Sequence, residues 1–264
     1  TMNLQNEKDI KIAFFDIDGT LIDMNRKVIS DQMLECLIRL KDNHVILCIA
    51  TGRPPVSVPH FPGIEFDAFL TFNASYCFTK DAVILSNPIP ASDVQQIIKN
   101  AASIGRPVAL ASKDRMGSNG IDDDLTDYFA ISKQTIDVAE DFDAFAQDEI
   151  YQIMLGCRAE DHDLLVKNAP GAKVTAWWDR AADIIPSNGG KGMGVEKILS
   201  YYGLTKDQAI AFGDGSNDIE MLEAAGTGVA MGNATENVKN IADVVCGSVA
   251  DEGIYHYCLD HHLI

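Results

Sequence analysis

Two carboxylates, Asp16 and Asp18, lie two residues apart in the stretch FFDIDGT. They follow the apolar residues 12–15, a run that is typical of a buried strand. Two acids placed in this way can take different roles in one reaction. Asp16 attacks phosphorus as a carboxylate nucleophile, while Asp18 protonates the leaving oxygen and later deprotonates water. Gly19 permits a tight turn, and Thr20 adds a hydroxyl donor for phosphoryl oxygens. The stretch therefore favours phosphoryl transfer.

Polar residues also follow three further apolar runs, at positions where parallel strands would end. Because ligands bind at the carboxyl ends of the strands in open parallel sheets, we expect these residues to meet there. Carboxylates gathered at one sheet edge repel each other unless a cation lies among them, and Mg²⁺ accepts such oxygen ligands together with water and substrate phosphate. The residues at these strand ends are Thr51 and Gly52 in ATGR, Asn73, and Asp214 and Asp218 in GDGSND.

Lys191 adds a cation to this set. It lies in the glycine-rich stretch SNGGKGMG, in the first turn of a helix predicted for about 192–202. The helix dipole disfavours a cation at that end, whereas helix N-termini and glycine-rich backbones bind phosphate. We therefore expect Lys191 to face an anion, the alternative being an ordinary surface lysine.

The elements that position these residues follow from the hydrophobic pattern. The apolar runs are continuous rather than alternating, which predicts parallel strands buried on both faces. Residues from about 86 to 186 contain shorter strand-like pieces and helices of another domain. The predicted fold is α/β: a Rossmann-like parallel-sheet core, 1–85 and 187–264, with an inserted α+β cap, 86–186. The core runs are 11–16, 45–51, 68–73, 209–214 and 227–232.

The order DIDGT, ATGR, Lys191, GDGSND resembles the four motifs of the haloacid dehalogenase superfamily of phosphatases. The insertion of roughly 100 residues between the second and third motifs resembles the C2-type cap of the Cof-type subgroup. Many members of that subgroup hydrolyse sugar phosphates and other small phosphomonoesters. The resemblance covers nearly the whole chain and implies a Mg²⁺-dependent phosphatase that acts through a phosphoaspartyl intermediate.

The resemblance also implies a role for each motif residue. Asp16 would be the nucleophile and Asp18 the acid and base. Mg²⁺ would be held by Asp16, the backbone carbonyl of Asp18, Asp214 and, in support, Asp218. Phosphate would be held by Thr51, Lys191 and Asn217, with Gly19, Thr20, Gly52 and Asn73 beside them. The chain departs from the subgroup at 73–75, where Asn-Ala-Ser replaces the common Asn-Gly-Ala, and in the SNGG before Lys191.

Other interpretations stay open at this stage. Asp16 and Asp18 suit a polar turn with a helix cap as well, and the same nucleophile serves a sugar phosphomutase. A non-catalytic module that binds a phosphorylated ligand belongs to another class, but such a module is expected to lose the nucleophile or the acid. Near the end of the insertion, four residues either grip a sugar or serve packing: Trp177, Trp178, Arg180 and Asp183.

Composition excludes some partners. The chain has 21 Lys and Arg against 39 Asp and Glu, a net charge of −18. Such a charge repels nucleic acids and anionic membranes, so we expect a small phosphorylated metabolite as the ligand. The 6 cysteines show no metal-ligand spacing, and residues 1–10 contain no apolar signal core. We therefore predict free thiols and a cytoplasmic location, while the sequence does not specify an oligomeric state.

Overall fold

The computed structural model describes residues 9–264, so the prediction for the N-terminal signal core lies largely outside the described residues. Two compact units divide the described chain. The first unit comprises 9–50, His60–Phe69 and Val195–Ile264. The second unit comprises Thr51–Pro59 and Leu70–Gly194. The predicted cap, 86–186, falls within the second unit, and the predicted boundaries stay a proposal.

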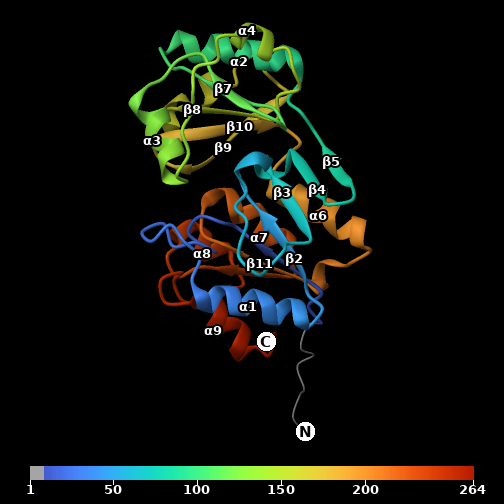
Figure 1. The fold of residues 1–264 in the computed structure, drawn as a ribbon. Helices are drawn as coiled ribbons and strands as arrows, with labels where there is room; N and C mark the ends of the chain where they lie inside the picture. The colour runs from blue at the N-terminus through green and yellow to red at the C-terminus, as the bar shows by residue number, and fades with distance from the viewer. Residues whose placement is uncertain (1–8) are drawn as a thin grey trace. The chain divides into compact units, whose positions relative to one another are not determined.

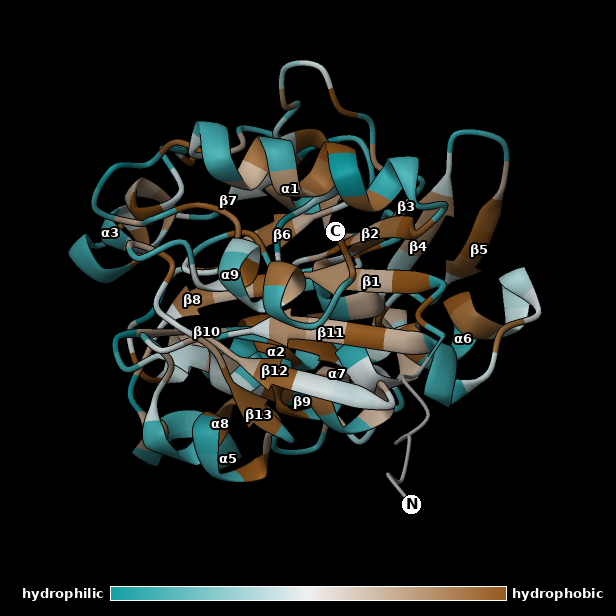
Figure 2. Cartoon of the chain, turned by 90° about the horizontal axis from the view of Figure 1, so that it is seen from below, coloured by the Kyte–Doolittle hydropathy of each residue, from teal (hydrophilic) through white to brown (hydrophobic). Residues whose placement is uncertain are grey.

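The first unit is built on a parallel sheet (Figure 1). Its strand order is β13-β12-β11-β1-β2-β3, and the pairs of β1 with β2, β1 with β11, β11 with β12 and β12 with β13 are parallel. Figure 2 shows brown, hydrophobic colour along β1 and β11, whose residues are almost all completely buried. The strands are β1 (Ile12–Phe15), β2 (Ile46–Ala50), β3 (Ala68–Thr71, which continues into the second unit), β11 (Ala209–Gly213), β12 (Thr227–Ala230) and β13 (Val244–Val245).

Helices connect these strands. Ser30 caps α1 by accepting a hydrogen bond from the backbone N–H of Met33. Helix α6 begins at Lys191, and Gly203, at φ +66°, ends it in the left-handed region. The helices are α1 (Asp31–Asp42), α6 (Lys191–Tyr202, which begins in the second unit), α7 (Ile219–Ala224), α8 (Glu236–Ile241) and α9 (Gly253–Asp260).

The second unit contains an antiparallel hairpin, β4 (Tyr76–Thr79) with β5 (Val83–Ser86), and a five-stranded sheet in the order β7-β6-β8-β10-β9. The pairs within the five-stranded sheet, which we call the cap sheet, are antiparallel. Its strands are β6 (Ala109–Ala111), β7 (Met116–Ser118), β8 (Gln152–Gly156), β9 (Ala172–Trp178) and β10 (Ala181–Pro186). The helices of this unit are α2 (Ala91–Ser103), α3 (Asp123–Ile131), α4 (Phe142–Phe145) and α5 (His162–Leu165).

The two faces of the cap sheet pack differently. One face contributes Ile153, Leu155 and Ile184 to a large apolar core with residues of α2, α4 and α5. The other face contributes Met154 to a smaller cluster with Leu125 and Phe129 of α3. Since side chains alternate along a strand, Gln152 and Met154 share this second face with Asp183, which lies opposite Met154 in the register. Polar residues of the cap sheet therefore lie beside α3.

The prediction of an α/β fold with a parallel core sheet and an inserted antiparallel sheet is confirmed. The sequence predicted 86–186 only as shorter strand-like pieces and helices, and it did not specify β10 or α3. The six cysteines are free, and five of them are buried, Cys246 being the exception. Among residues 9–264, no helix is long and apolar enough to cross a membrane.

Candidate active site

Three carboxylates meet in the first unit. Asp16, Asp214 and Asp218 each offer one oxygen, and these three oxygens lie within 4.8 Å of one another. Asp16 directly follows β1, and Asp214 directly follows β11. Because β1 and β11 are parallel neighbours with Phe15 opposite Phe212, the two strands end side by side. The sheet therefore assembles the acidic centre that the sequence predicts.

The turn after β1 fits closely around Asp214. Gly19 adopts φ +85°, and a Cβ atom there would lie 2.2 Å from Asp214 Oδ2, so only glycine fits this position. Thr20 Oγ1 donates to Asp214 Oδ1 at 2.9 Å. Asn233, which the sequence prediction missed, donates from Nδ2 to the Gly19 carbonyl at 2.9 Å. The sequence signal that could have identified Asn233 was its position soon after the end of β12.

Asp218 organises the turn after β11. Its Oδ2 accepts hydrogen bonds from the backbone N–H groups of Asp214 and Gly215, both at 3.0 Å. The side chain is completely buried, at 0% exposure. It ends the 3₁₀ turn Ser216–Asp218, which also carries Asn217 and leads into α7. Asp218 thus belongs to the acidic centre and holds its backbone in place.

The acidic centre is under strong electrostatic repulsion. Burial raises the pKa of Asp214 well above its usual range, and the charges of Asp16 and Asp218 raise it further. The hydrogen bond from Thr20 acts in the opposite direction. All the available donors are hard oxygen atoms, which suit a divalent cation such as Mg²⁺ and would relieve the repulsion. The residues therefore fit a metal ion of this class.

Asp18 is half-buried in the same turn, where its backbone bridges to Ile22. Among the described residues, its carboxylate is outside the three-carboxylate group. That placement is compatible with the predicted division of roles, in which Asp18 contributes its backbone carbonyl to the metal and its side chain to proton transfer. Asn217 lies half-buried beside Asp218.

The second unit contains four further residues of the predicted phosphate site, namely Thr51, Gly52, Asn73 and Lys191. Thr51, 2% exposed, and Gly52 follow β2, and the backbone N–H of Asn73 donates to the Thr51 carbonyl at 2.9 Å. Lys191 opens α6 and is buried at 1% exposure, which is unusual for a lysine. Asn73, also buried at 1%, lies in the 3₁₀ turn Phe72–Ala74.

That turn after β3 is strained. Phe72, Asn73 and Ala74 have φ of 51°, 54° and 86°, and each left-handed non-glycine residue costs on the order of 1 kcal/mol. Packing holds the turn: the Phe72 ring stacks on Tyr151 at 5.7 Å, and Gly194 lacks the Cβ that would approach the Ala74 Cβ to 2.5 Å. Such strain persists only where the surroundings impose it.

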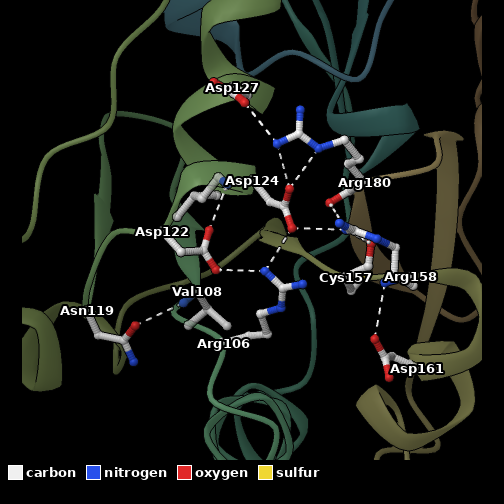
Figure 3. Close-up of polar contacts among 11 residues, drawn as sticks. Arg106, Val108, Asn119, Asp122, Asp124, Asp127, Cys157, Arg158, Asp161 and Arg180 are labelled. Carbon is white, nitrogen blue, oxygen red and sulfur yellow. Dashed lines mark hydrogen bonds and ion pairs between the residues drawn. The ribbon is translucent and has the colours of Figure 1, made fainter.

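Two of the four residues that were candidates for gripping a sugar have other partners. Arg180 donates to Asp124 and Asp127 at 2.8 Å each, and its guanidinium lies 4.9 Å from the centre of the Trp178 ring. Arg106 and Arg158 also contact Asp124, both at 2.9 Å (Figure 3). We call Asp124 with these three arginines the arginine cluster. Asp183 is buried at 1% exposure, so Arg180 and Asp183 favour the packing interpretation.

The sequence of the chain matches the model of the haloacid dehalogenase-like hydrolases over residues 13–258. The chain belongs to this family and is a Cof-type phosphatase of subclass IIB, with the cap sheet as its inserted domain. It acts on small phosphomonoesters, which makes it a phosphoric monoester hydrolase.

Relatives and solved structures agree with this assignment. The putative phosphatase YkrA of Bacillus subtilis (strain 168) is 32% identical over 249 residues, which cover 93% of this chain and 95% of the relative. The pyridoxal phosphate phosphatase YbhA of Escherichia coli (strain K12) is 26% identical, over 95% of this chain and 98% of the relative. The structure of the subclass IIB sugar phosphatase BT4131 superposes with a TM-score of 0.90 at 26% identity, covering 96% of this chain and 100% of that chain.

Proposed function

We propose that this phosphatase hydrolyses sugar phosphates with Mg²⁺ and passes through a phosphoaspartyl intermediate on Asp16. The observation that carries the proposal is the acidic centre, in which the predicted nucleophile lies with two further carboxylates within 4.8 Å. The likeness to the sugar phosphatase BT4131 supports the sugar phosphate as substrate. The six free thiols suit a reducing compartment, and we place the protein in the cytoplasm.

The chain's own carboxylates account for both halves of the reaction. The Asp16 carboxylate attacks phosphorus, and the bond from phosphorus to the sugar oxygen breaks. Asp18 gives its proton to the leaving alkoxide and then takes a proton from the water that attacks phospho-Asp16, so inorganic phosphate leaves and Asp16 is restored. The two steps require two carboxylates with different roles, and Asp16 and Asp18 lie in one turn.

The acidic residues Asp16, Asp214 and Asp218 and the Asp18 carbonyl would hold Mg²⁺, which neutralises charge on the phosphoryl oxygens when it is bound. The remaining predicted residues bind the phosphoryl group through hydroxyls, amides and one cation. They are Gly19, Thr20, Thr51, Gly52, Lys191 and Asn217, and the seventh predicted residue, Asn73, supports the loop that carries Thr51 and Gly52. The inserted domain, predicted as 86–186, selects the sugar and excludes water.

A panel of phosphomonoesters tests the substrate. Phosphate release from sugar phosphates, nucleotides and cofactor phosphates is measured in Mg²⁺ and after chelation, and we expect the highest kcat/KM for a sugar phosphate and no turnover without metal. A uniformly low rate for sugars would overturn the substrate assignment. Full activity in metal-free buffer would overturn the metal. Transfer that depends on a sugar bisphosphate, without phosphate release, would identify a phosphomutase instead.

Asp18→Asn tests the phosphoaspartyl intermediate. An aryl phosphate has a good leaving group and scarcely needs the acid, so the variant should become phosphorylated from it yet lose the phosphoryl group slowly. Rapid acid quench and intact-protein mass should show one added phosphoryl group, far more with an aryl phosphate than with a sugar phosphate. Equal dephosphorylation rates in the variant and the wild type would remove Asp18 from the second step.

A further inference from the structure

Three buried polar side chains of the second unit form one hydrogen-bonded network. Asn73 Nδ2 donates to Asp183 Oδ2 at 3.1 Å and to Gln152 Oε1 at 3.0 Å. Gln152 Nε2 donates in turn to the backbone carbonyl of Gly52 at 2.8 Å. The other Asp183 oxygen, Oδ1, accepts from the Tyr128 hydroxyl. Side chains of β8 and β10 are thereby linked to the loops that follow β2 and β3.

These bonds occupy the donors of Asn73. A side-chain amide has two N–H groups, and Asp183 and Gln152 accept both. The backbone N–H of Asn73 donates to the Thr51 carbonyl. Asn73 therefore directs its N–H groups toward the second unit's own acceptors, and its amide is oriented by a carboxylate rather than offered to a phosphate.

These hydrogen bonds also hold two loop segments in place, one of which is strained and the other closely packed. Asn73 is the middle residue of the left-handed turn after β3. A Cβ at Gly52 would lie 3.1 Å from Asn73 Nδ2 and 3.3 Å from Asp183 Oδ2, so the backbone of the loop after β2 approaches both side chains closely. A shift of Asp183 would consequently move both loops.

We propose that Asp183, assisted by Gln152, is a positioning residue of the phosphatase reaction. It fixes the Asn73 amide, and through that amide and the Gly52 carbonyl it fixes the loop that begins with Thr51 and Gly52. Asn73 then serves as a structural link between the cap sheet and this loop. The inference rests on the proposed function, in which Thr51 and Gly52 bind the phosphoryl group.

The charge state of Asp183 is consistent with this role. Burial raises its pKa to about 6, although the hydrogen bonds from Tyr128 and Asn73 and the charge of Lys191 lower it. At neutral pH the group is therefore a carboxylate that accepts both hydrogen bonds. A neutral Asn at this position can still offer Oδ1 to Asn73 while its own amide donates to the Tyr128 hydroxyl, whereas Leu offers nothing.

The test compares Asp183→Leu with Asp183→Asn, using kinetics on an aryl phosphate and thermal melting. Asp183→Leu should lower kcat/KM by about tenfold to a hundredfold, because catalytic groups displaced by about 1 Å lose rate of that order. Asp183→Asn should recover most of the loss. The matched control is Asp93→Leu on α2, a carboxylate buried at 7% exposure that accepts from the Gly171 N–H at 3.0 Å, and it should keep wild-type kcat/KM.

Three results would overturn the inference: a folded Asp183→Leu protein with full activity, an Asp183→Asn variant as impaired as Asp183→Leu, or an equal loss in the Asp93→Leu control. If Asp183→Leu does not fold, Gln152→Met decides, since it is nearly isosteric and removes the bonds to Asn73 and Gly52. That variant should lose about as much activity, and full activity would refute the link. Absence of phosphatase turnover in the wild type would overturn the proposed function and this inference together.

Discussion

The two units each contain a cluster of charged residues around a buried or half-buried carboxylate, and the clusters differ in how that charge is balanced. In the first unit, burial and two neighbouring carboxylates raise the pKa of Asp214 well above its usual range. In the second unit, burial alone would raise the pKa of Asp124, but hydrogen bonds from Arg158, Arg180 and Arg106 lower it to about 2.

The difference separates structural charge from charge that is arranged for a ligand. The arginine cluster joins segments at 106, 124, 158 and 180 through cations that the chain itself supplies. The acidic centre gathers three carboxylates, and burial together with the charges of Asp16 and Asp218 disfavours the ionised form of Asp214, which favours a positive ligand from outside. The raised pKa of Asp214 therefore indicates a site for a cationic ligand, whereas the lowered pKa of Asp124 indicates a structural group of ion pairs.

The strongest test of this contrast is Asp16→Asn. The amide keeps the shape of the side chain but cannot attack phosphorus, so kcat should fall by at least about 10⁴-fold. Because the substitution removes one of three mutually repelling charges, the melting temperature of the metal-free protein should be equal to or above that of the wild type. Steady-state kinetics and calorimetry check both expectations, and wild-type turnover by the verified variant would exclude Asp16 as the nucleophile.

The next test uses pH and the buried carboxylate Asp183. Its folded pKa, about 6, lies above the unfolded value of about 4, so the folded state binds the extra proton between these values. The group's contribution is most favourable below pH 4 and is lost as the pH rises to 6, by about 3 kcal/mol in all, from roughly 2 pKa units at 1.36 kcal/mol each. Urea unfolding from pH 4 to 7 should show a smaller decline in Asp183→Asn than in the wild type. Parallel pH curves would contradict the shift.

Asp124→Asn should destabilise the protein without touching the acidic centre. The change leaves three arginines without their shared carboxylate, and because their side chains are partly exposed to water we expect a loss of about 2 kcal/mol. The stabilisation by Asp124 is present above pH 4 and lost as the pH falls toward 2, the reverse of the dependence on Asp183. Urea unfolding of the variant and the wild type at pH 3 and pH 7 measures the difference in stability. Equal stabilities at pH 7 would show that the arginine cluster does not stabilise the fold.

The smallest effect expected is that of Ser30→Ala. Ser30 accepts from the Met33 N–H at 3.0 Å and donates to the Glu252 carboxylate at 2.8 Å. Loss of the cap should cost about 1 kcal/mol, with kcat/KM unchanged. A change in kcat/KM as large as that of the charge variants would mean that activity follows general stability rather than local charge.

The sequence contained enough information to predict the acidic centre. Strand ends of a parallel sheet meet at one edge, so Asp16 and Asp214 could be expected together from their positions after two apolar runs. The α/β class was likewise predictable from local patterns, because the apolar runs are continuous. The capped helix α1 was predictable because its capping serine, Ser30, directly precedes apolar residues at helical spacing.

The second unit was harder to predict because its polar contacts join distant segments. The bonds of Asn73 reach residues 79 and 110 positions away, and no local pattern indicates such pairs. Strand β10 was missed because an aspartate interrupts its apolar residues and a proline ends it. Helix α3 follows a capping Asp122, a signal that was hidden within the acidic residues of 121–127.

The distribution of cysteines has a practical consequence for observing the two units in solution. Cys36, Cys48 and Cys258 are buried in the first unit, and Cys77 and Cys157 are buried in the second. Burial raises the pKa of Cys77 to about 12 and that of Cys157 to about 11, so these thiols react with alkylating reagents only when their surroundings open. The rate of alkylation at each cysteine, followed by peptide mass, therefore reports the opening of each unit separately in the unmodified chain.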